Sequence, residues 1–319
     1  MERIKIVIPD SKTVADSTVN LKCFQELGDV VEYELSNAEN LPERVQNADI
    51  ILCNKAPMNK TILQTAERLK YIGLFATGYN NVDLEYTRSR GITVCNAANY
   101  STDAVAQHTF ALILNHCSKI SEYNSFVQSG GWIESDVFSP FVYPTRELSG
   151  KTLGIVGFGT IGRAVAKIAL AFNMNVLFYS RTLKSDTFGA KQTDLITLVR
   201  QSDFVTAHCP LNNDSSKMFN DRLFAEFKKG SVFINTSRGG VVDELALKKA
   251  LETGRLSAAA VDVIDTEPMK PDCPLLGLQN LTVTPHVAWA AAETRERLIS
   301  VAYNNLSAFL SGKPCNVVN

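Results

Sequence analysis

The sequence lacks the features that mark membrane, secreted and nucleic-acid-binding proteins. None of its segments is a continuous apolar run of the length, about 20 residues, that is needed to span a bilayer. The first residues, MERIKIVIPD, pass directly into a strand-like run with no long apolar signal segment. A net charge of -1 provides no basic field for a polyanion. We therefore expect a cytoplasmic protein that binds no nucleic acid and no membrane, and that acts on a small molecule.

Paired cysteines are also missing. There are seven cysteines, an odd number, and no Cys-x-x-Cys motif. This pattern disfavours a disulfide framework and a zinc cluster, so we predict no metal site. The cysteines in apolar runs, Cys53, Cys95, Cys117 and Cys209, are expected to pack as small hydrophobic side chains.

What the sequence does contain is a regular alternation of short β-branched runs with helical segments. The strand-like runs are IKIVIPD, VVEYEL, DIILCNK, YIGLFATG and GITVCNA, then KTLGIVGF, NVLFYS, DFVTAHC, SVFINTS, LSAAAVDVI and LTVTPH. Helices are expected over residues 59–69, 102–120, 161–172, 243–254 and 290–310, and a loop over SGGWIESDVFSPFVYPT. Alternation of this kind predicts parallel sheets. We expect two α/β domains of unequal size, with a boundary near Ser101.

A glycine-rich turn begins the second series. Gly157, Gly159 and Gly162 follow an apolar strand and open a helical segment, which is the placement of a dinucleotide-binding fingerprint. Gly157 permits a tight turn, Gly159 lets the backbone approach a pyrophosphate, and Gly162 lets the helix pack closely. Free N–H groups at the helix start then face the phosphates. A structural turn without a ligand is the alternative.

The end of the next strand indicates which dinucleotide binds. A carboxylate there accepts the ribose 2′-hydroxyl of NAD, whereas an arginine pairs with the 2′-phosphate of NADP. This chain has Ser180, Arg181 and Thr182 and no acid. We therefore expect NADP(H) to be preferred, with NAD(H) as the alternative. The competing interpretation is a solvated arginine at a strand end.

Together these motifs resemble the D-isomer-specific 2-hydroxyacid dehydrogenase family, especially its glyoxylate/hydroxypyruvate reductase and glycerate dehydrogenase branch. The resemblance covers nearly the whole chain and rests on ATGYNNVDL, NYSTDAVAQHT, GFGTIG, HCPLN, NTSRGGVVDE, AVDVIDTEP and TPHVAWA. It implies a Rossmann-like dinucleotide-binding domain, residues 102–286, inserted in a flavodoxin-like substrate domain, residues 1–101 and 287–319. Both are doubly wound. It also implies a homodimer.

Reduction of a 2-keto acid gives an independent reason to single out three residues. The reaction needs a proton for the carbonyl oxygen and a group that holds the carboxylate. His286 suits the proton donor, Glu267 its hydrogen-bonded partner, and Arg238 the substrate anchor. Each has a structural alternative: a histidine that ends a strand, a loop carboxylate, and an arginine that caps a helix or pairs on the surface. Sequence spacing does not show that the three converge.

The remaining site residues come mainly from the resemblance. The loop containing Thr77, Gly78 and Tyr79 is expected to cradle the substrate carboxylate with backbone N–H groups, and Asp83 to cap a helix. Trp132 is expected either to cover the cleft or to pack on a partner subunit. Beyond the residues named above, the resemblance implies cofactor contacts from Thr102, Thr160, Ile161, His208, Pro210, Thr236 and Asp262.

The sequence thus predicts an NAD(P)-dependent reductase of small 2-keto acids such as hydroxypyruvate or glyoxylate. Two alternatives stay within the same family: a dinucleotide-sensing binding protein similar to transcriptional corepressors, and a dehydrogenase for a bulkier D-2-hydroxy acid. An amino-acid dehydrogenase or a hydrolase that retains NAD is a third. That third alternative would need an amine-handling lysine or larger insertions, which the sequence does not suggest.

Overall fold

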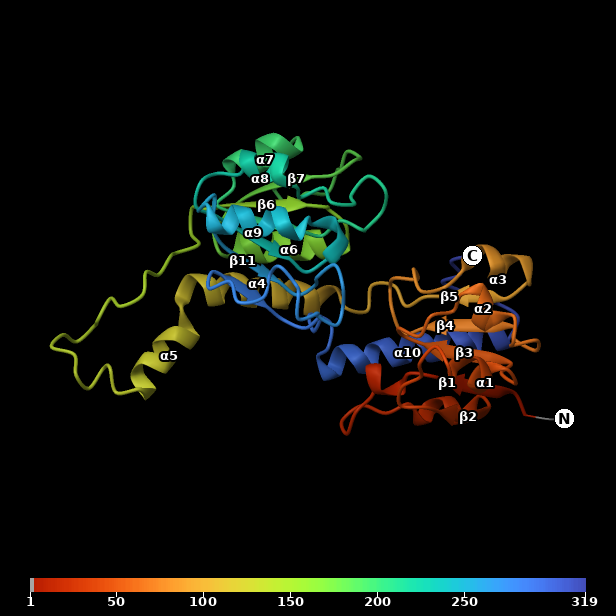
Figure 1. The fold of residues 1–319 in the computed structure, drawn as a ribbon. Coiled ribbons are helices and arrows are strands. Elements are labelled where there is room, and N and C mark those ends of the chain that lie inside the picture. The colour runs from red at the N-terminus through yellow and green to blue at the C-terminus, as the bar shows by residue number, and fades with distance from the viewer. Residues whose placement is uncertain (1–2) are drawn as a thin grey trace. The chain divides into compact units, whose positions relative to one another are not determined.

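The computed structural model describes residues 3–319, which form two units, each built on its own parallel sheet (Figure 1). One unit holds the residues up to Ser101 together with Ala290–Asn319, and the other holds Thr102–Trp289. The sheets have five and seven strands. The predicted fold class, two parallel-sheet α/β domains of unequal size, is confirmed.

The sheet of the first unit has the order β2-β1-β3-β4-β5, which is the flavodoxin-like order. Its strands are β1 (Lys5–Ile8), β2 (Asp29–Glu32), β3 (Ile50–Cys53), β4 (Tyr71–Leu74) and β5 (Thr93–Cys95). Every residue of β3 and β4 is buried. This burial on both faces explains why these strands read as continuous apolar runs.

The helices of the first unit are α1 (Leu41–Val45), α2 (Lys60–Leu63), α3 (Leu84–Ser89) and α10 (Ala292–Leu310), with short 3₁₀ turns at Ser11–Thr13 and Lys22–Glu26. Asp83 caps α3 by accepting a bond from the Tyr86 N–H, as predicted. The helix expected over residues 59–69 is wrong in length, because α2 ends at Leu63. Beyond it the chain forms i to i+3 turns, and the Thr65 hydroxyl bonds to the carbonyls of Ile62 and Pro42.

The sheet of the second unit has the order β12-β11-β10-β9-β6-β7-β8. The chain starts at β6, winds outward to β8, and then crosses back to β9, which is the Rossmann order. The strands are β6 (Thr152–Val156), β7 (Asn175–Tyr179), β8 (Lys191–Gln192), β9 (Phe204–Ala207), β10 (Ser231–Asn235), β11 (Leu256–Val261) and β12 (Leu281–Val283). β8 was not predicted, because two polar residues carry no apolar pattern.

Helices cover both faces of this sheet. On one face α4 (Thr102–Ser118) packs against α6 (Thr160–Ala171). The other face carries α7 (Leu195–Gln201), α8 (Asp221–Glu226) and α9 (Glu244–Glu252). Leu153 and Ile155 of β6 join the first core and Val156 joins the second. In the strand order β6 lies between β9 and β7, and the winding direction of the chain reverses there.

Residues 120–145, which we call the arm, leave the end of α4 and extend away from the sheet (Figure 1). Lys119, at a φ of 54°, separates α4 from α5 (Ile120–Gln128). The loop predicted over SGGWIESDVFSPFVYPT follows α5 and has no further helix or strand. Its apolar side chains are exposed: Ile133 by 89%, Phe138 by 90% and Phe141 by 93%.

The seven cysteines are all free thiols, and Cys53, Cys95 and Cys117 are buried in the two cores as predicted. Cys209 is only partly buried, although it contacts the core on the α9 side of the second sheet. Across residues 3–319, no helix combines the length and the apolar character that crossing a membrane requires.

Candidate active site

The predicted cofactor and catalytic residues of the second unit lie after the carboxyl ends of its strands. The glycine turn follows β6, residues 180–182 follow β7, residues 208–210 follow β9, residues 236–238 follow β10, Asp262 and Glu267 follow β11, and His286 follows β12. Thr102 begins α4. Because all paired strands are parallel, these segments share one edge of the sheet. Ligands of doubly wound folds bind at this edge.

The geometry of the glycine turn requires glycine at two of its three positions and leaves open space at the other. Gly157 has a φ of 102°, and a Cβ there would lie 2.6 Å from the backbone of His208 and Cys209. A Cβ on Gly162 would lie 2.2 Å from the Gly157 carbonyl oxygen. No atom lies within 4 Å of a Cβ placed on Gly159. The first and third glycines are therefore needed for packing, whereas the second keeps open space beside the backbone.

Gly159 is also the N-cap of α6, and it provides no side-chain acceptor for the first N–H groups of the helix, those of Thr160 and Ile161. Such a helix start attracts an anion through its N–H groups and its dipole. A hollow of about 490 Å³ extends along α6 from Thr160 to Ile168, and its lining also includes Thr102 of α4 and Phe188.

His286 and Glu267 are brought together by two different loops. The Nδ1 atom of His286 lies 2.6 Å from Oε2 of Glu267, and both side chains are partly exposed. The other carboxylate oxygen of Glu267 accepts a bond from the Ile264 N–H. Both carboxylate oxygens of Glu267 are therefore engaged, and Nε2 of His286 is the ring atom left to face a substrate.

Asp262 fixes the segment that carries His286. Its carboxylate is 1% exposed and accepts bonds from the Thr284 hydroxyl at 2.6 Å and from the N–H groups of Val287 and Ala288, both at 2.9 Å. Its backbone carbonyl accepts the His286 N–H at 2.7 Å. His286 itself has a left-handed φ of 56°. Asp262 thus holds the backbone on both sides of His286, the candidate proton donor.

His108 of α4 extends this network. Its Nε2 lies 3.0 Å from the Thr284 hydroxyl and 3.5 Å from the Asp262 carboxylate. The observed contacts connect α4 with the end of β12, so a helix distant in sequence helps to hold the His286 segment.

Arg238 is positioned by its neighbours on both sides. The amide of Asn235, which is fully buried, donates to the Arg238 carbonyl and accepts from the N–H and hydroxyl of Ser237. A Cβ on Gly239 would lie 1.9 Å from the backbone of Ile264, so the Arg238 turn presses against the turn that leads to Glu267. The Arg238 guanidinium donates to the Ser237 carbonyl.

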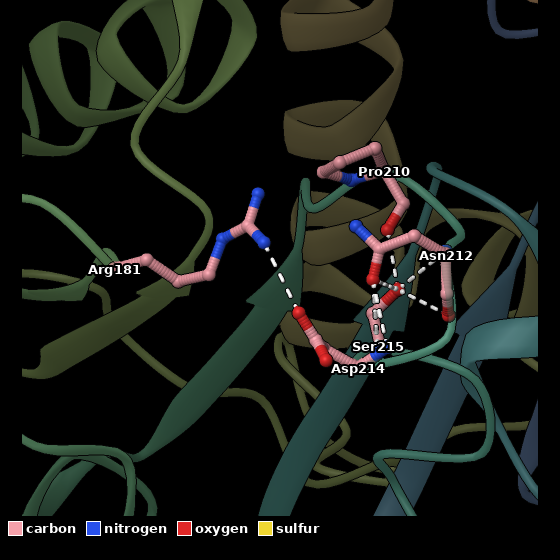
Figure 2. Close-up of polar contacts among 5 residues, drawn as sticks. All are labelled: Arg181, Pro210, Asn212, Asp214 and Ser215. Carbon is pink, nitrogen blue, oxygen red and sulfur yellow. Dashed lines mark hydrogen bonds and ion pairs between the residues drawn. The ribbon is translucent and has the colours of Figure 1, made fainter.

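The end of β7 carries the predicted phosphate-binding residues. The side chain of Gln192 donates to the carbonyls of Ser180 and Thr182, so β8 holds this turn. Arg181 projects into solvent, and its guanidinium pairs with Asp214 at 3.2 Å (Figure 2). Asp214 comes from the loop after β9.

His208, Pro210 and Thr236 line the same edge. Burial lowers the pKa of His208 to about 3, and its Nε2 lies 3.0 Å from the Thr206 hydroxyl. The ring is therefore neutral and unsuited to proton donation. The Thr236 hydroxyl shares a 3.0 Å bond with Thr109 of α4, and the Pro210 carbonyl accepts the Ser215 hydroxyl.

The predicted substrate loop belongs to the first unit and follows β4. The Thr77 hydroxyl donates to the Ala97 carbonyl, and the Asn96 amide donates to the Thr77 carbonyl. The Asn81 side chain donates to the Ala56 carbonyl. These bonds fix the loop on both sides of Gly78, while the Tyr79 side chain is 43% exposed.

The fold and these residues define a class of protein: a two-domain α/β protein with a dinucleotide-type glycine turn and a histidine–carboxylate pair at one sheet edge. The chain belongs to the D-isomer-specific 2-hydroxyacid dehydrogenases, because residues 110–288 match the family model described as "D-isomer specific 2-hydroxyacid dehydrogenase, NAD binding domain". The second unit therefore contains an NAD-binding domain.

Full-length relatives agree with this assignment. A hydroxypyruvate reductase of Blautia hydrogenotrophica is 37% identical over 99% of this chain and 100% of its own. A glyoxylate reductase of Thermococcus litoralis is 40% identical over 88% of this chain and 86% of its own. Among solved structures, an acyclic imino acid reductase in complex with NADPH and D-Arg has a TM-score of 0.88 and 32% identity, and covers 99% of this chain and 100% of its own.

Proposed function

We propose that the protein reduces a small 2-keto acid of the hydroxypyruvate or glyoxylate type to the D-2-hydroxy acid, with NAD(P)H as the reductant. The observation that carries the proposal is the 2.6 Å contact between His286 and Glu267 at the strand edge that also bears the glycine turn and Arg238. The names of the Blautia and Thermococcus relatives support this substrate class.

In this proposal His286 donates the proton to the substrate carbonyl oxygen. Glu267 holds Nδ1, and its negative charge stabilises the protonated imidazole before transfer. Arg238 binds the substrate carboxylate, since its planar guanidinium offers two parallel donors. For the first unit, we propose that the loop containing Thr77, Gly78 and Tyr79 binds substrate through its backbone N–H groups.

The second unit fits a nicotinamide dinucleotide, which supplies the hydride when bound. The open space beside Gly159 and the N-terminus of α6 suit a pyrophosphate. Thr102, Thr160 and Ile161 border that position, with His208, Pro210 and Thr236 along the edge. We infer a preference for NADP(H) over NAD(H), because Arg181 stands where NAD-specific sites have an acid.

We further infer that the enzyme is a cytoplasmic homodimer. The arm presents Ile133, Phe138 and Phe141 almost fully to solvent, and exposed apolar side chains of this kind favour burial against a second copy of the chain. The Trp132 indole donates a hydrogen bond to the Phe138 carbonyl, and this bond links two parts of the arm. Seven free thiols suit a reducing compartment.

The experiment is to mix the purified protein with NADPH or NADH and hydroxypyruvate, glyoxylate, pyruvate or phenylpyruvate, and to follow loss of reduced nicotinamide absorbance. We expect turnover with hydroxypyruvate or glyoxylate, faster with NADPH than with NADH. Turnover confined to phenylpyruvate would replace the substrate class with a bulkier one.

A binding experiment run in parallel separates enzyme from sensor. If both dinucleotides bind and no keto acid promotes oxidation, the dinucleotide-sensing alternative replaces the reductase. Adding ammonia to the same keto acids tests the imino acid chemistry named for one structural relative. Oxidation that depends on ammonia would overturn the keto acid assignment.

A further inference from the structure

The end of β7 lacks the carboxylate that usually accepts a ribose hydroxyl, yet a carboxylate lies beside Arg181. Asp214, in the loop between β9 and α8, places Oδ2 3.2 Å from Arg181 Nη1 (Figure 2). β9 and β7 flank β6, so the two residues approach each other from opposite sides of the strand that leads into the glycine turn. This is the crevice where the adenosine end of a dinucleotide enters a Rossmann-like domain.

The position of Asp214 is set by the structure of its loop. Asn212 Oδ1 accepts the N–H groups of Asp214 and Ser215, and the Asn212 N–H donates to the Ser215 hydroxyl. That hydroxyl donates in turn to the Pro210 carbonyl at 2.6 Å. Figure 2 shows this cluster on the side of Asp214 away from Arg181. Because the turn is internally bonded, the carboxylate is presented to Arg181 by a defined backbone.

We propose that Asp214 is a second determinant of cofactor choice and acts against Arg181. With NAD(H) bound, Asp214 supplies from the β9 loop the ribose acceptor that β7 lacks. With NADP(H) bound, the 2′-phosphate pairs with the Arg181 guanidinium, and the ion pair between Arg181 and Asp214 is broken. This deepens the proposed function, on which it rests, and assigns the chain a dual-cofactor site.

Electrostatics give the direction of each effect. The 2′-phosphate carries close to two negative charges, so a fixed carboxylate beside it raises the free energy of the NADP complex. The same carboxylate accepts a hydrogen bond from an unphosphorylated ribose. Arg181 and Asp214 are both mostly exposed, so each contribution is modest and weakens with added salt.

The test measures binding without turnover. ADP-ribose and its 2′-phosphorylated form are titrated calorimetrically into the full-length protein and into Asp214→Asn. We expect the variant to bind 2′-phospho-ADP-ribose about fivefold more tightly and ADP-ribose about fivefold less tightly, the size of one exposed charge contact. Asp214→Glu should retain the wild-type order of affinities.

Glu252→Gln is the matched control, since it removes an exposed carboxylate paired with Lys248 at the far end of α9. It should change neither affinity. The proposal is overturned if Asp214→Asn leaves both affinities unchanged, or if it weakens 2′-phospho-ADP-ribose binding, because Asp214 would then orient Arg181 for the phosphate. Because the experiment measures binding, its result tests this proposal even if the protein reduces no keto acid.

Discussion

At the scale of single residues, the candidate chemistry depends on which histidine carries a proton. His286 contacts a carboxylate, whereas the partly buried His208 and His116 do not, and desolvation lowers their pKa values to about 3 and about 4. For His116 the cations Lys119 and Arg146 add to this effect. The three side chains therefore have separate roles, although each is simply a histidine in the sequence.

Replacing His286 by alanine should reduce turnover by about 10² to 10⁴, the range found for removal of a general acid. The dissociation constant for NADPH should change little, because the imidazole acts on the substrate. Steady-state kinetics and calorimetric titration measure the two quantities. Equal losses in turnover and cofactor binding would show that His286 belongs to the dinucleotide site instead.

Partly buried neutral histidines also make stability depend on pH. The folded-state pKa of His208 is about 3 against an ordinary 6.5, so between those values the unfolded chain binds a proton that the folded chain does not. Stability should therefore fall as the pH is lowered through this window, by at most about 1.4 kcal/mol per pH unit for this group.

Urea midpoints at pH 7 and pH 5 test this expectation. His208→Gln should be less stable at pH 7 but should lose less on acidification than the parent does. His116→Gln is the internal comparison and should flatten the remaining dependence. A pH dependence that is the same in the parent and in His208→Gln would contradict the assignment of a neutral, partly buried ring.

At the scale of elements, different glycines of the same turn are expected to affect the stability of the fold and the binding of the cofactor. Gly162→Ala forces a Cβ against the Gly157 carbonyl, whereas Gly159→Ala meets nothing within 4 Å. We expect Gly162→Ala to lower the melting temperature by several degrees and to weaken NADPH binding as a secondary effect. Gly159→Ala should melt like the parent yet bind NADPH on the order of tenfold less tightly.

Calorimetry on the two variants measures both properties. If Gly159→Ala bound NADPH as the parent does, the turn would be structural and the pyrophosphate site would lie elsewhere.

The same scale shows what the sequence could and could not predict. Apolar runs predicted every long strand of both sheets, and the Asp83 cap follows from local chemistry. The two-residue β8 and the early end of α2 escaped prediction because bonds to distant backbone decide them.

For the candidate site, the residue types were predictable but their supports were not. Asn235 and His108 lie within motifs that carry the family resemblance, but neither they nor Gln192 could be assigned these bonds from the sequence. Each bonds a segment far along the chain or a turn whose shape is unknown beforehand. The ion pair of Arg181 with Asp214 joins loops after two different strands, and only the sheet order brings them together.

At the scale of the whole molecule, the arm determines the proposed assembly. Replacing Phe138 and Phe141 together by serine removes much of its exposed apolar surface. We expect the variant to run at half the parent's mass in light scattering after gel filtration, with unchanged circular dichroism. Leu245→Ser, which alters an exposed apolar side chain on α9, should leave the mass unchanged. A monomeric parent would refute the dimer.

The way the chain returns to its first unit has a consequence for synthesis on the ribosome. The second unit is continuous, so all its strands are available once Trp289 has emerged. The first unit starts earlier but must wait, because Arg295 bonds to the Val14 carbonyl, Asn305 to the Asn96 carbonyl, and Asn319 to the backbone at β5. The part of the chain made first is thus the last to be completed, and the side of β4 that α10 covers in the folded unit stays uncovered throughout translation of the inserted domain.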